Sequence, residues 1–506
     1  MYPRGYIAAT LKVRTVSPPV RRGIVVTEKA GQRSGLIPLL VIATAQLMLV
    51  LDDSIVNIAL PSIQQELGID AVHLPWIVNG YILAFGALLL LGGRIGDLYG
   101  RRRALQAGLV IFVLASLVGG LGLNSGALIG ARAVQGLGAA LAAPNALALI
   151  ATTFSERKTR DAALALYGAM SGIGIVIGLL LGGVLTGTLG WRWVFFINIP
   201  IGILVLLGSR TLVGAERHPG SLDVRGAVLG TSGMVALVYA ITRFGEDGFA
   251  DPIGLGLIGA ALVLLTAFIA TQARSRTPLV PLSLFRDRGR AGAYASMLLL
   301  AVGPMGTFYV ITLYLQHIQH YSPLQTGAGW LPFAAGIVAG AGGAPKLLNK
   351  VAPRVVAAAG ALLSAAAAFW FSFIQVDTSY WLHLAPAMFF LALGFGLGII
   401  ALTQAAVYNT ASHEAGIASA LLNSAQQIGV ALGLAVLAGI AATVTGTSEP
   451  GATAGAQLVA GYGSALAVAA GLLAAAGILA AATLPSKPTA QADGKSAVAA
   501  VDQPSH

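Results

Sequence analysis

The sequence contains no cysteine, and only 10% of its 506 residues are charged. The missing cysteines exclude disulfides, thiolate metal sites and cysteine nucleophiles together. The scarcity of charge excludes a soluble globular protein, because such proteins carry about 25% charged residues. Instead the chain has 56% hydrophobic residues, 65 glycines and a mean hydropathy of +0.81. This composition indicates a membrane protein, in which glycine lets helices approach each other closely.

Long apolar runs cover most of the chain. A helix that crosses about 30 Å of hydrocarbon needs about 20 apolar residues. Fourteen windows meet this requirement, near 36–59, 75–95, 104–122, 127–152, 163–186, 194–213, 225–243, 253–273, 291–316, 327–345, 355–374, 381–409, 416–444 and 461–484. An even number puts both chain ends on one side, and the basic residues concentrate in alternate loops. We therefore expect an all-α polytopic membrane protein with both termini cytoplasmic.

The net charge of +11 could indicate a nucleic-acid partner. The basic residues, however, lie in short loops between apolar runs, where they report topology, so we expect no nucleic acid. Residues 1–35 hold seven Lys or Arg without an apolar core, which indicates a basic cytoplasmic tail and no cleavable signal peptide. Residues 485–506 are polar, and we expect a disordered cytoplasmic tail.

Two adjacent acids and one arginine lie inside apolar windows. Asp52 and Asp53 occur in LDDSIVNIALP, and Arg132 occurs in LIGARAVQGLGAA. A central arginine costs at least ~2.5–3.5 kcal/mol, so such residues usually face a partner or a cavity. A structural ion pair between Arg132 and an acid is one interpretation. A functional site that faces a cavity is the other, because ionisable residues inside a membrane commonly mark substrate or ion pathways.

The loop after the second window reads GGRIGDLYGRRRAL. Gly93 and Gly100 permit a tight turn or a close helix contact. Asp97 can form a charge-assisted network with Arg101 and Arg102 between adjacent helix ends. A plain basic loop would explain the arginines, but it would explain neither the glycine spacing nor the acid.

This loop resembles the signature of the major facilitator superfamily, Gly-x-Leu-Ala-Asp-Arg-x-Gly-Arg-Lys, with Leu98 in place of the first arginine. Other blocks are similar to the fourteen-span drug/proton antiporters of the EmrB/QacA type. The first-span block of that group places its aspartate on Asp52, and its fourth-span motif, Arg-x-x-Gln-Gly-x-Gly, falls on Arg132 and Gln135. The resemblance associates this arginine with proton coupling.

The fifth window contains a glycine run that resembles the antiporter motif of the superfamily, which marks exporters, with Leu179 in place of its proline. By spacing alone the run indicates helix packing, since glycines four apart share one helix face. The blocks GWRWVFFINIPIG and RTPLVPLSLFRDR also resemble the fourteen-span group. The motif glycines are Gly174, Gly178, Gly182 and Gly183.

The resemblance implies two six-helix bundles around a central cavity, with two extra central spans. It also implies export by alternating access across the cell membrane, and we expect the protein to function as a monomer. The expected divisions are the tail 1–35, the N-terminal bundle 36–213, the two inserted spans with cytoplasmic links 214–290, the C-terminal bundle 291–484 and the tail 485–506.

The positions of the Asp and Glu residues limit which of them could couple transport to protons. After residue 161 every Asp and Glu falls in a loop, a tail or the end of a window. We therefore assign proton coupling to Asp52, Asp53 and Arg132, and we favour Asp52 as carrier because it lies on the family motif. Asp53 would then face a neighbouring helix or the outer vestibule. Polar residues in the windows are candidates for the substrate cavity, although a hydrogen bond between helices explains each one equally well. They are Asn57, Gln135, Tyr309, Tyr314, Gln404, Asn423 and Gln427.

The predicted function is proton-coupled efflux of hydrophobic or amphiphilic small molecules, either a drug or a self-made secondary metabolite. Alternatives on the same fold are a siderophore or lipid-like metabolite exporter and a symporter, and a membrane-integral enzyme is a remote alternative. No Gly-x-x-x-x-Gly-Lys-Ser/Thr loop is present, so we expect a proton gradient and no cofactor as the energy source. The seven histidines lie mostly in loops or at the ends of windows, and His317 with His320 has no nearby carboxylate to complete a metal site, so we expect no metal.

Overall fold

The computed structural model describes residues 35–154, 156–213, 221–275, 277–408, 410, 415–446 and 453–486. Every regular element within these residues is a helix. The two predicted tails, 1–35 and 485–506, fall almost entirely outside the described residues. Fourteen segments are long and apolar enough to cross a membrane, which confirms the predicted number of spans.

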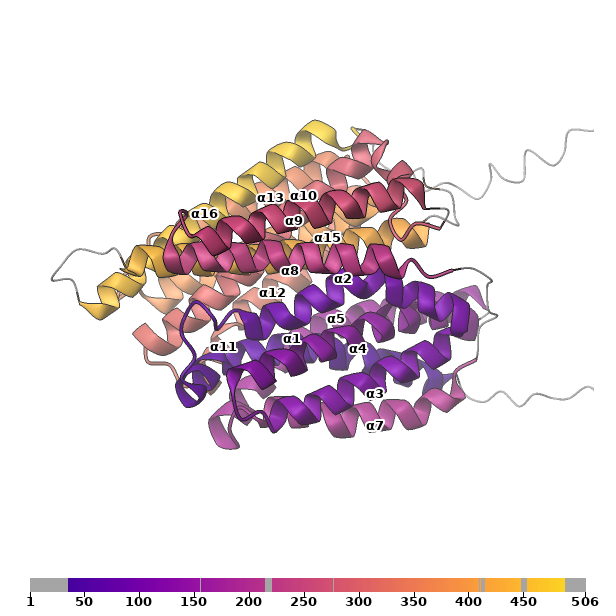
Figure 1. Cartoon of the computed structure of the whole chain (residues 1–506), viewed down its shortest axis with the longest axis horizontal. Coiled ribbons are helices and arrows are strands. Elements are labelled where there is room, and N and C mark those ends of the chain that lie inside the picture. The colour runs from indigo at the N-terminus through magenta and orange to yellow at the C-terminus, as the bar shows by residue number, and fades with distance from the viewer. Residues whose placement is uncertain are drawn as a thin grey trace, which may run out of the picture. The chain divides into compact units, whose positions relative to one another are not determined.

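The first six spans pack together as one bundle (Figure 1). In it α2 and α3 pack on α4, while α1 packs on α5. Gly100 separates α2 from α3 with a φ of 103°, a conformation that glycine adopts without strain. The elements are α1 (Leu36–Leu67), α2 (Trp76–Tyr99), α3 (Arg101–Gly120), α4 (Ser125–Thr153), α5 (Arg157–Thr188), α6 (Trp193–Phe196), α7 (Asn198–Gly208) and the 3-10 turn η1 (Ser209–Thr211).

The last six spans form a second bundle with the same packing pattern. Here α12 and α13 pack on α14, as α2 and α3 do on α4, and α10 packs on α15 as α1 does on α5. The elements are α10 (Arg288–Leu313), the π-helical turn η3 (Tyr314–Ile318), α11 (Pro323–Gly329), α12 (Leu331–Leu348), α13 (Pro353–Phe371), the π-helical turn η4 (Tyr380–Leu384), α14 (Ala385–Val407), α15 (Ala415–Gly446) and α16 (Ala454–Thr483).

Two inserted helices, α8 (Val224–Asp247) and α9 (Pro252–Arg274), precede the short 3-10 turn η2 (Leu282–Phe285). Figure 1 shows α8 in magenta between α2 and α15, and α8 packs against both of them as well as against α9. The Trp76 and Tyr239 rings meet edge to face with centroids 5.8 Å apart. A Cβ built on Gly245 would lie 2.7 Å from the Gly439 Cα, so the α8 and α15 backbones touch. The inserted pair therefore covers the line along which α2 and α15 meet.

The predicted span limits differ from the helices by several residues. α1 continues past 59 to Leu67 although it contains Pro61, and the tenth span begins at Pro323 instead of 327. The earlier start has a local cause, because Ser322 and Gln325 form a reciprocal capping box around Pro323. Hydropathy windows register the apolar core of a helix, whereas caps and polar end turns extend it.

Hydrogen bonds join the two bundles near one end of the molecule, which we call the Glu66 end after the acid at the end of α1. The Tyr309 hydroxyl donates to the Ala71 carbonyl oxygen at 3.3 Å, joining the second bundle to the loop after α1. The Gln316 side chain donates to the Ile58 carbonyl oxygen at 3.1 Å. We call the opposite end, where α2 turns into α3, the Arg101 end.

Candidate functional site

A buried ion pair joins α1 to α4. The Arg132 Nη1 atom lies 2.5 Å from the Asp52 Oδ2 atom, and neither side chain has any exposed surface. Burial of two charges is costly, and it is offset only by close geometry together with hydrogen bonds to the remaining polar atoms. Helix α1 supplies the acid and α4 supplies the base, so the pair fixes these two helices against each other.

Three side-chain donors surround the Asp52 carboxylate. In addition to Arg132, the Gln135 amide donates to Oδ1 at 3.2 Å and the Asn198 amide donates to the same oxygen at 2.7 Å. The Gln135 amide also donates to the Ser116 hydroxyl at 2.8 Å. An ionised carboxylate only accepts hydrogen bonds, and this set of donors matches that form. Helices α1, α4 and α7 thus meet at one acid, and α3 joins them through Gln135.

The Arg132 guanidinium extends the cluster to α2. Its Nε atom donates to the Ile77 carbonyl oxygen at 3.0 Å, and its Nη1 atom also donates to the Gln135 side-chain oxygen at 3.0 Å. The guanidinium carbon lies 4.4 Å from the centre of the Tyr81 ring, a cation–π contact. α2 comes this close because α4 carries Gly136, where a Cβ would lie 2.3 Å from the Tyr81 carbonyl oxygen.

Asp53 has different surroundings from its neighbour. The residue is half-buried, and its buried Oδ1 atom has no hydrogen-bond partner among the described residues. The Asn57 amide, one turn further along α1, donates to the Asp53 backbone carbonyl oxygen at 2.8 Å. The Asn57 Oδ1 atom is likewise buried without a described partner. Asp53 interacts electrostatically with Asp52 and Arg132 but shares none of the hydrogen bonds of the pair.

The antiporter-motif glycines hold α5 against two different elements. Three of them face α1, where a Cβ would come within 2.1–3.1 Å of an α1 side chain. The contacts are Gly174 with Val50, Gly178 with Ser54 and Gly182 with Ile55. Gly183 faces the other bundle, since its Cβ would lie 2.8 Å from the Leu324 Cα of α11. The helix packing expected from the spacing is present, and the fourth glycine adds a contact between bundles.

The loop motif at the Arg101 end forms a hydrogen-bonded network. The Arg101 Nε and Nη2 atoms lie 3.2 and 3.1 Å from the Asp97 Oδ1 atom, and Nη1 donates to the Ala148 carbonyl oxygen at 3.3 Å. Arg102 donates to the Leu212 carbonyl oxygen at 3.3 Å. The network therefore connects the ends of α2, α3 and α4 with the segment that follows η1.

A hollow of about 420 Å³ lies beside this network. Its wall combines the loop motif with the links of the inserted helices and the start of α15. Among the lining residues are Gly93, Arg94, Asp97, Arg101, Pro144, Asp223, Pro278 and Gly416. The two bundles and the inserted pair thus meet at the Arg101 end as well.

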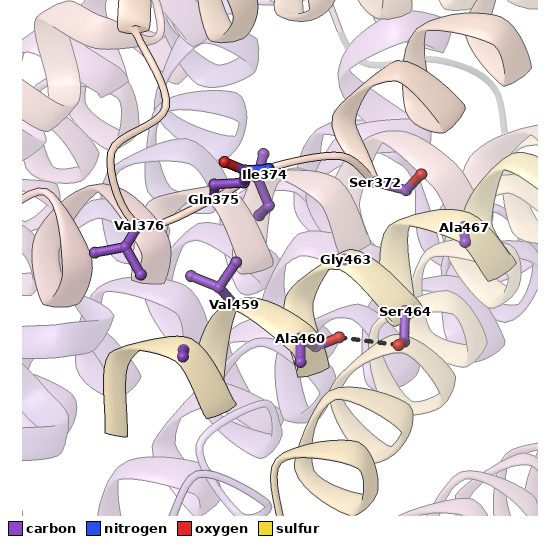
Figure 2. Close-up of a pocket in the computed structure, with 10 residues that line it drawn as sticks. Ser372, Ile374, Gln375, Val376, Val459, Ala460, Gly463, Ser464 and Ala467 are labelled. Atoms are coloured by element: carbon purple, nitrogen blue, oxygen red, sulfur yellow. Dashed lines mark hydrogen bonds between the residues drawn. The ribbon is translucent and has the colours of Figure 1, made fainter. Parts of the chain in front are cut away.

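A second hollow, of about 580 Å³, lies between the segment after α13 and the start of α16 (Figure 2). Its lining is uncharged and mostly apolar, with Ser372, Gln375 and Ser464 as the polar residues. The Ser464 hydroxyl donates to the Ala460 carbonyl oxygen at 2.9 Å, as the dashed line shows, and the Ser372 hydroxyl donates to the Phe369 carbonyl oxygen at 2.6 Å. Both hydroxyls are used within the protein, and we assign no function to this hollow.

The seven polar residues predicted for the cavity lie in several places. Gln135 bonds to the ion pair, Asn57 bonds to the Asp53 backbone, and Gln427 packs on Gly86 of α2. Tyr309 bonds to the loop after α1, whereas the Tyr314 hydroxyl donates to the Gln375 carbonyl oxygen at 2.5 Å. Gln404 is half-buried on α14, and Asn423 is exposed on α15. None of the seven lines either hollow, so a central substrate cavity stays a prediction.

Sequence reasoning missed Ser116, Tyr81 and Asn198 as members of the cluster. Each is a polar or aromatic-polar side chain inside an apolar window, and the cost of burying such groups was the available signal. Asn198 even lies within the quoted GWRWVFFINIPIG block. Among the described residues no group of His, Cys, Asp or Glu could hold a metal ion.

Comparison with known proteins identifies relatives over most of the chain. The sequence profile of the Major Facilitator Superfamily matches residues 42–434. The puromycin resistance protein pur8 of Streptomyces alboniger is 44% identical over 406 residues, which are 79% of this chain and 80% of that protein. The cephamycin export protein CmcT of Amycolatopsis lactamdurans is 38% identical over 452 residues, which are 88% of this chain and 92% of that protein.

The fold also matches a solved structure. The crystal structure of the human organic anion transporter MFSD10 (TETRAN) aligns with a TM-score of 0.59 and covers 89% of this chain and 100% of that chain. The sequence identity is 15%, so this likeness concerns the fold alone.

Proposed function

The chain belongs to the major facilitator superfamily, and we propose that it exports hydrophobic or amphiphilic small molecules in exchange for protons. The superfamily and the export-protein relatives indicate a multi-pass membrane transporter and not an enzyme. The names of the relatives, puromycin resistance and cephamycin export, favour antibiotics or other secondary metabolites as substrates.

The buried charge cluster is the observation that carries the coupling mechanism. Asp52, Asp53 and Arg132 together hold two carboxylates and one guanidinium, which is a net charge of −1 inside the membrane. Such a charge is costly in hydrocarbon. Either a proton or a singly cationic substrate would neutralise it. The proton and the cationic substrate would therefore compete for the cluster. Antiport requires this competition, because binding of one must displace the other.

The contacts between bundles support alternating access. We propose that the Arg101 end faces the cytoplasm, because basic loops favour that side. Both termini would then be cytoplasmic and the transporter would reside in the cell membrane. The contacts of Gly183 with Leu324 and of Tyr309 with Ala71 would close the path to the outside. We further propose that a monomer suffices, and that 36–213 and 291–484 move as units about 214–290.

Export is tested first in a host that lacks its own pumps. Expression should raise resistance to puromycin or to a cephamycin and should lower its accumulation in the cells. An insertion-competent Asp52→Asn variant, checked by membrane fractionation, serves as the control and should give neither effect. Unchanged resistance and accumulation for both compounds would exclude them as substrates.

Coupling is tested in inverted membrane vesicles with an imposed proton gradient. Adding a transported compound should dissipate the gradient in vesicles with the wild-type protein and not in vesicles with Asp52→Asn. A compound that is transported without moving protons would contradict antiport. Protons that move in the same direction as the compound would instead support the symporter alternative.

A further inference from the structure

We propose that Asp53 binds and releases the coupling proton, while Asp52 remains ionised throughout as the anion that holds Arg132. This division rests on the proposed proton coupling and assigns its two roles to two adjacent residues. It reverses the expectation from the sequence motif, which favours Asp52. The geometry points to it for three independent reasons.

The first reason is that the contacts of Asp52 favour its ionised form. Its Oδ2 atom faces the Arg132 guanidinium at 2.5 Å, and its Oδ1 atom accepts hydrogens from Gln135 and Asn198. A proton on Oδ1 would compete with these two donors, and a proton on Oδ2 would weaken the contact with Arg132. Protonation would also leave the buried guanidinium without its counter-ion, which is strongly unfavourable.

The second reason is that Asp53 offers both a vacant acceptor and access. Its Oδ1 atom is buried and accepts no hydrogen bond from a described residue, a situation that favours the neutral carboxyl over the carboxylate. The side chain is half-buried, whereas Asp52 has no exposed surface. Asp53 can therefore take up a proton without breaking the ion pair.

The third reason is the charge balance of the cluster. The ionisable groups that interact with Asp53 among the described residues are Asp52 on its own helix, Arg132 on α4 and Tyr81 on α2. Asp52 and Arg132 neutralise each other, and α5 and α7 present the uncharged residues Gly178 and Asn198 to α1. The charge on Asp53 alone therefore decides whether the cluster carries −1 or 0.

The same site suits a cationic group of the substrate. Asp53 and Asn57 are four residues apart, so their side chains lie on one face of α1. Each presents a buried oxygen without a described donor. In the exporting step an ammonium group would bind these two oxygens after the Asp53 O–H bond releases its proton to the solution. One O–H bond forms and one breaks per cycle, and no other bond changes.

Infrared spectroscopy tests the assignment without any substrate. The full chain in lipid vesicles is titrated with acid, and the carbonyl stretching band of a buried protonated carboxyl is followed. We expect this band in the wild type, its loss in Asp53→Asn, and its return at a shifted frequency in Asp53→Glu. Asp251→Asn, which alters an acid outside the spans, is the control and should keep the band. A band that persists in Asp53→Asn overturns the proposal.

Transport of puromycin as the probe provides the second measurement. Asp53→Asn should retain puromycin counterflow between vesicles and medium, although at a higher half-saturating concentration because the ammonium group loses its anionic partner, and it should lose at least about tenfold in gradient-driven transport. Asp52→Asn should lose both, because Arg132 loses its partner. Full coupling in Asp53→Asn, or uncoupled counterflow in Asp52→Asn, contradicts the proposal. A wild type without gradient-driven transport overturns the proposed function, and the infrared titration then still distinguishes Asp53 from Asp52.

Discussion

Two arginines pair with acids of α1, and their surroundings differ sharply. The pair of Arg132 with Asp52 is fully buried, whereas the Arg192 and Glu66 side chains keep 34% and 50% of their surface exposed. Removal of one partner of a buried pair costs about 3–5 kcal/mol, because the other charge stays behind. An exposed pair contributes only about 0–1 kcal/mol.

We therefore expect Arg132→Ala to lower the thermal unfolding midpoint and to abolish gradient-driven transport. Arg192→Ala, the matched control, should leave both nearly unchanged. Thermal unfolding of the purified protein and the vesicle assay measure the two effects. Equal losses of transport in the two variants would mean that Arg132 has no special part in coupling.

Outside the spans, Asp251 forms a pH-sensitive contact at the start of α9. The Arg243 Nε atom donates to its Oδ2 atom at 3.0 Å, and the Gly254 backbone N–H donates to the same atom at 2.8 Å. The hydrogen bond from Arg243, and then that from the backbone, hold the pKa of Asp251 below its ordinary value. Its negative charge also lies favourably at a helix N-terminus.

This lowered pKa determines how the stabilisation by Asp251 changes with pH. The folded protein binds the Asp251 proton more weakly than the unfolded chain does, so the stabilisation is complete above the ordinary value of about 3.9. It is lost as the pH falls through the folded-state pKa. We expect amide protection factors over 248–254 to drop in acid, as measured by hydrogen exchange. Asp251→Asn should remove this pH dependence, and a variant with an unchanged profile would refute the assignment.

At the residue scale, the sequence identified those members of the buried charge cluster that belong to family motifs. Asp52 and Arg132 were predicted as a pair, and the structure brings them together with Gln135, which was predicted for the substrate cavity. Asn198 and Ser116 were not predicted, because the contacts join residues as far apart in the chain as 52 and 198. Which polar residue of an apolar window meets which acid depends on the rotation of each helix. That rotation is set by packing and not by local sequence.

Among the elements, α5 depends on small residues where it crosses α1. A methyl group at Gly178 would lie 2.1 Å from the Ser54 Oγ atom and 3.1 Å from the Leu51 carbonyl oxygen. At Gly187, further along the same helix, a methyl group would meet nothing within 4 Å. The two glycines therefore separate the effect of crowding from the effect of helix propensity.

We expect Gly178→Ala to destabilise the protein by about 1–3 kcal/mol, the usual cost of overpacking. Gly187→Ala should be neutral or stabilising by up to about 1 kcal/mol, because alanine favours the helix. Thermal unfolding of both variants provides the comparison. A Gly178→Ala protein as stable as Gly187→Ala would show that α5 does not need this close approach.

The elements themselves were largely predictable from hydropathy, but their interruptions were not. The tenth span is divided at Trp330, which has no exposed surface and donates from its indole nitrogen to the Thr312 hydroxyl at 3.1 Å. Its ring lies 4.2 Å from that of Phe308, between centroids. The hydropathy of a window does not show whether its helix is continuous or interrupted. The interruption at Trp330 depends on contacts with Thr312 and Phe308 of α10, which the window does not contain.

For the whole molecule, the closing contact at the Glu66 end can be weakened by one methyl group. Gly183→Ala would place it 2.8 Å from both the Leu324 Cα and the Pro323 carbonyl oxygen, so the bundles must separate there. An overpacking cost of about 1–3 kcal/mol corresponds to a population shift of roughly 5- to 150-fold. We expect this shift to favour conformations that are open at the Glu66 end.

Because the sequence contains no cysteine, the distance between the bundles can be measured with spin labels on two introduced cysteines. Spin labels on Gly187→Cys and Leu324→Cys would be the only thiol adducts, one on each bundle. Their distance distribution should lengthen when Gly183→Ala is added. Gly168→Ala, where a methyl group meets nothing within 4 Å, is the matched control and should leave the distribution unchanged. An unaltered distribution in Gly183→Ala would show that the bundles do not close through this glycine.

At this scale the sequence predicted fourteen spans and a fold of two bundles with an inserted pair. It did not predict where the inserted pair lies. The reason is that α8 bridges α2 and α15, which are far apart in the chain, through a ring contact and a backbone approach between glycines. Such contacts leave no periodic pattern in the α8 sequence.

The position of α8 makes the two sides of the transporter unequal. On one side α8 contacts both bundles, while on the other side α5 meets α11 and α12 directly. When the two bundles rock, α8 would therefore hold α2 and α15 together, so that the bundles separate more easily between α5 and the pair α11 and α12. The wider lateral gap would open between α5 and α12, facing the lipid. A lipophilic compound dissolved in the bilayer would then reach the carboxylates from that side, so the residues along this gap would select compounds before any contact with Asp53.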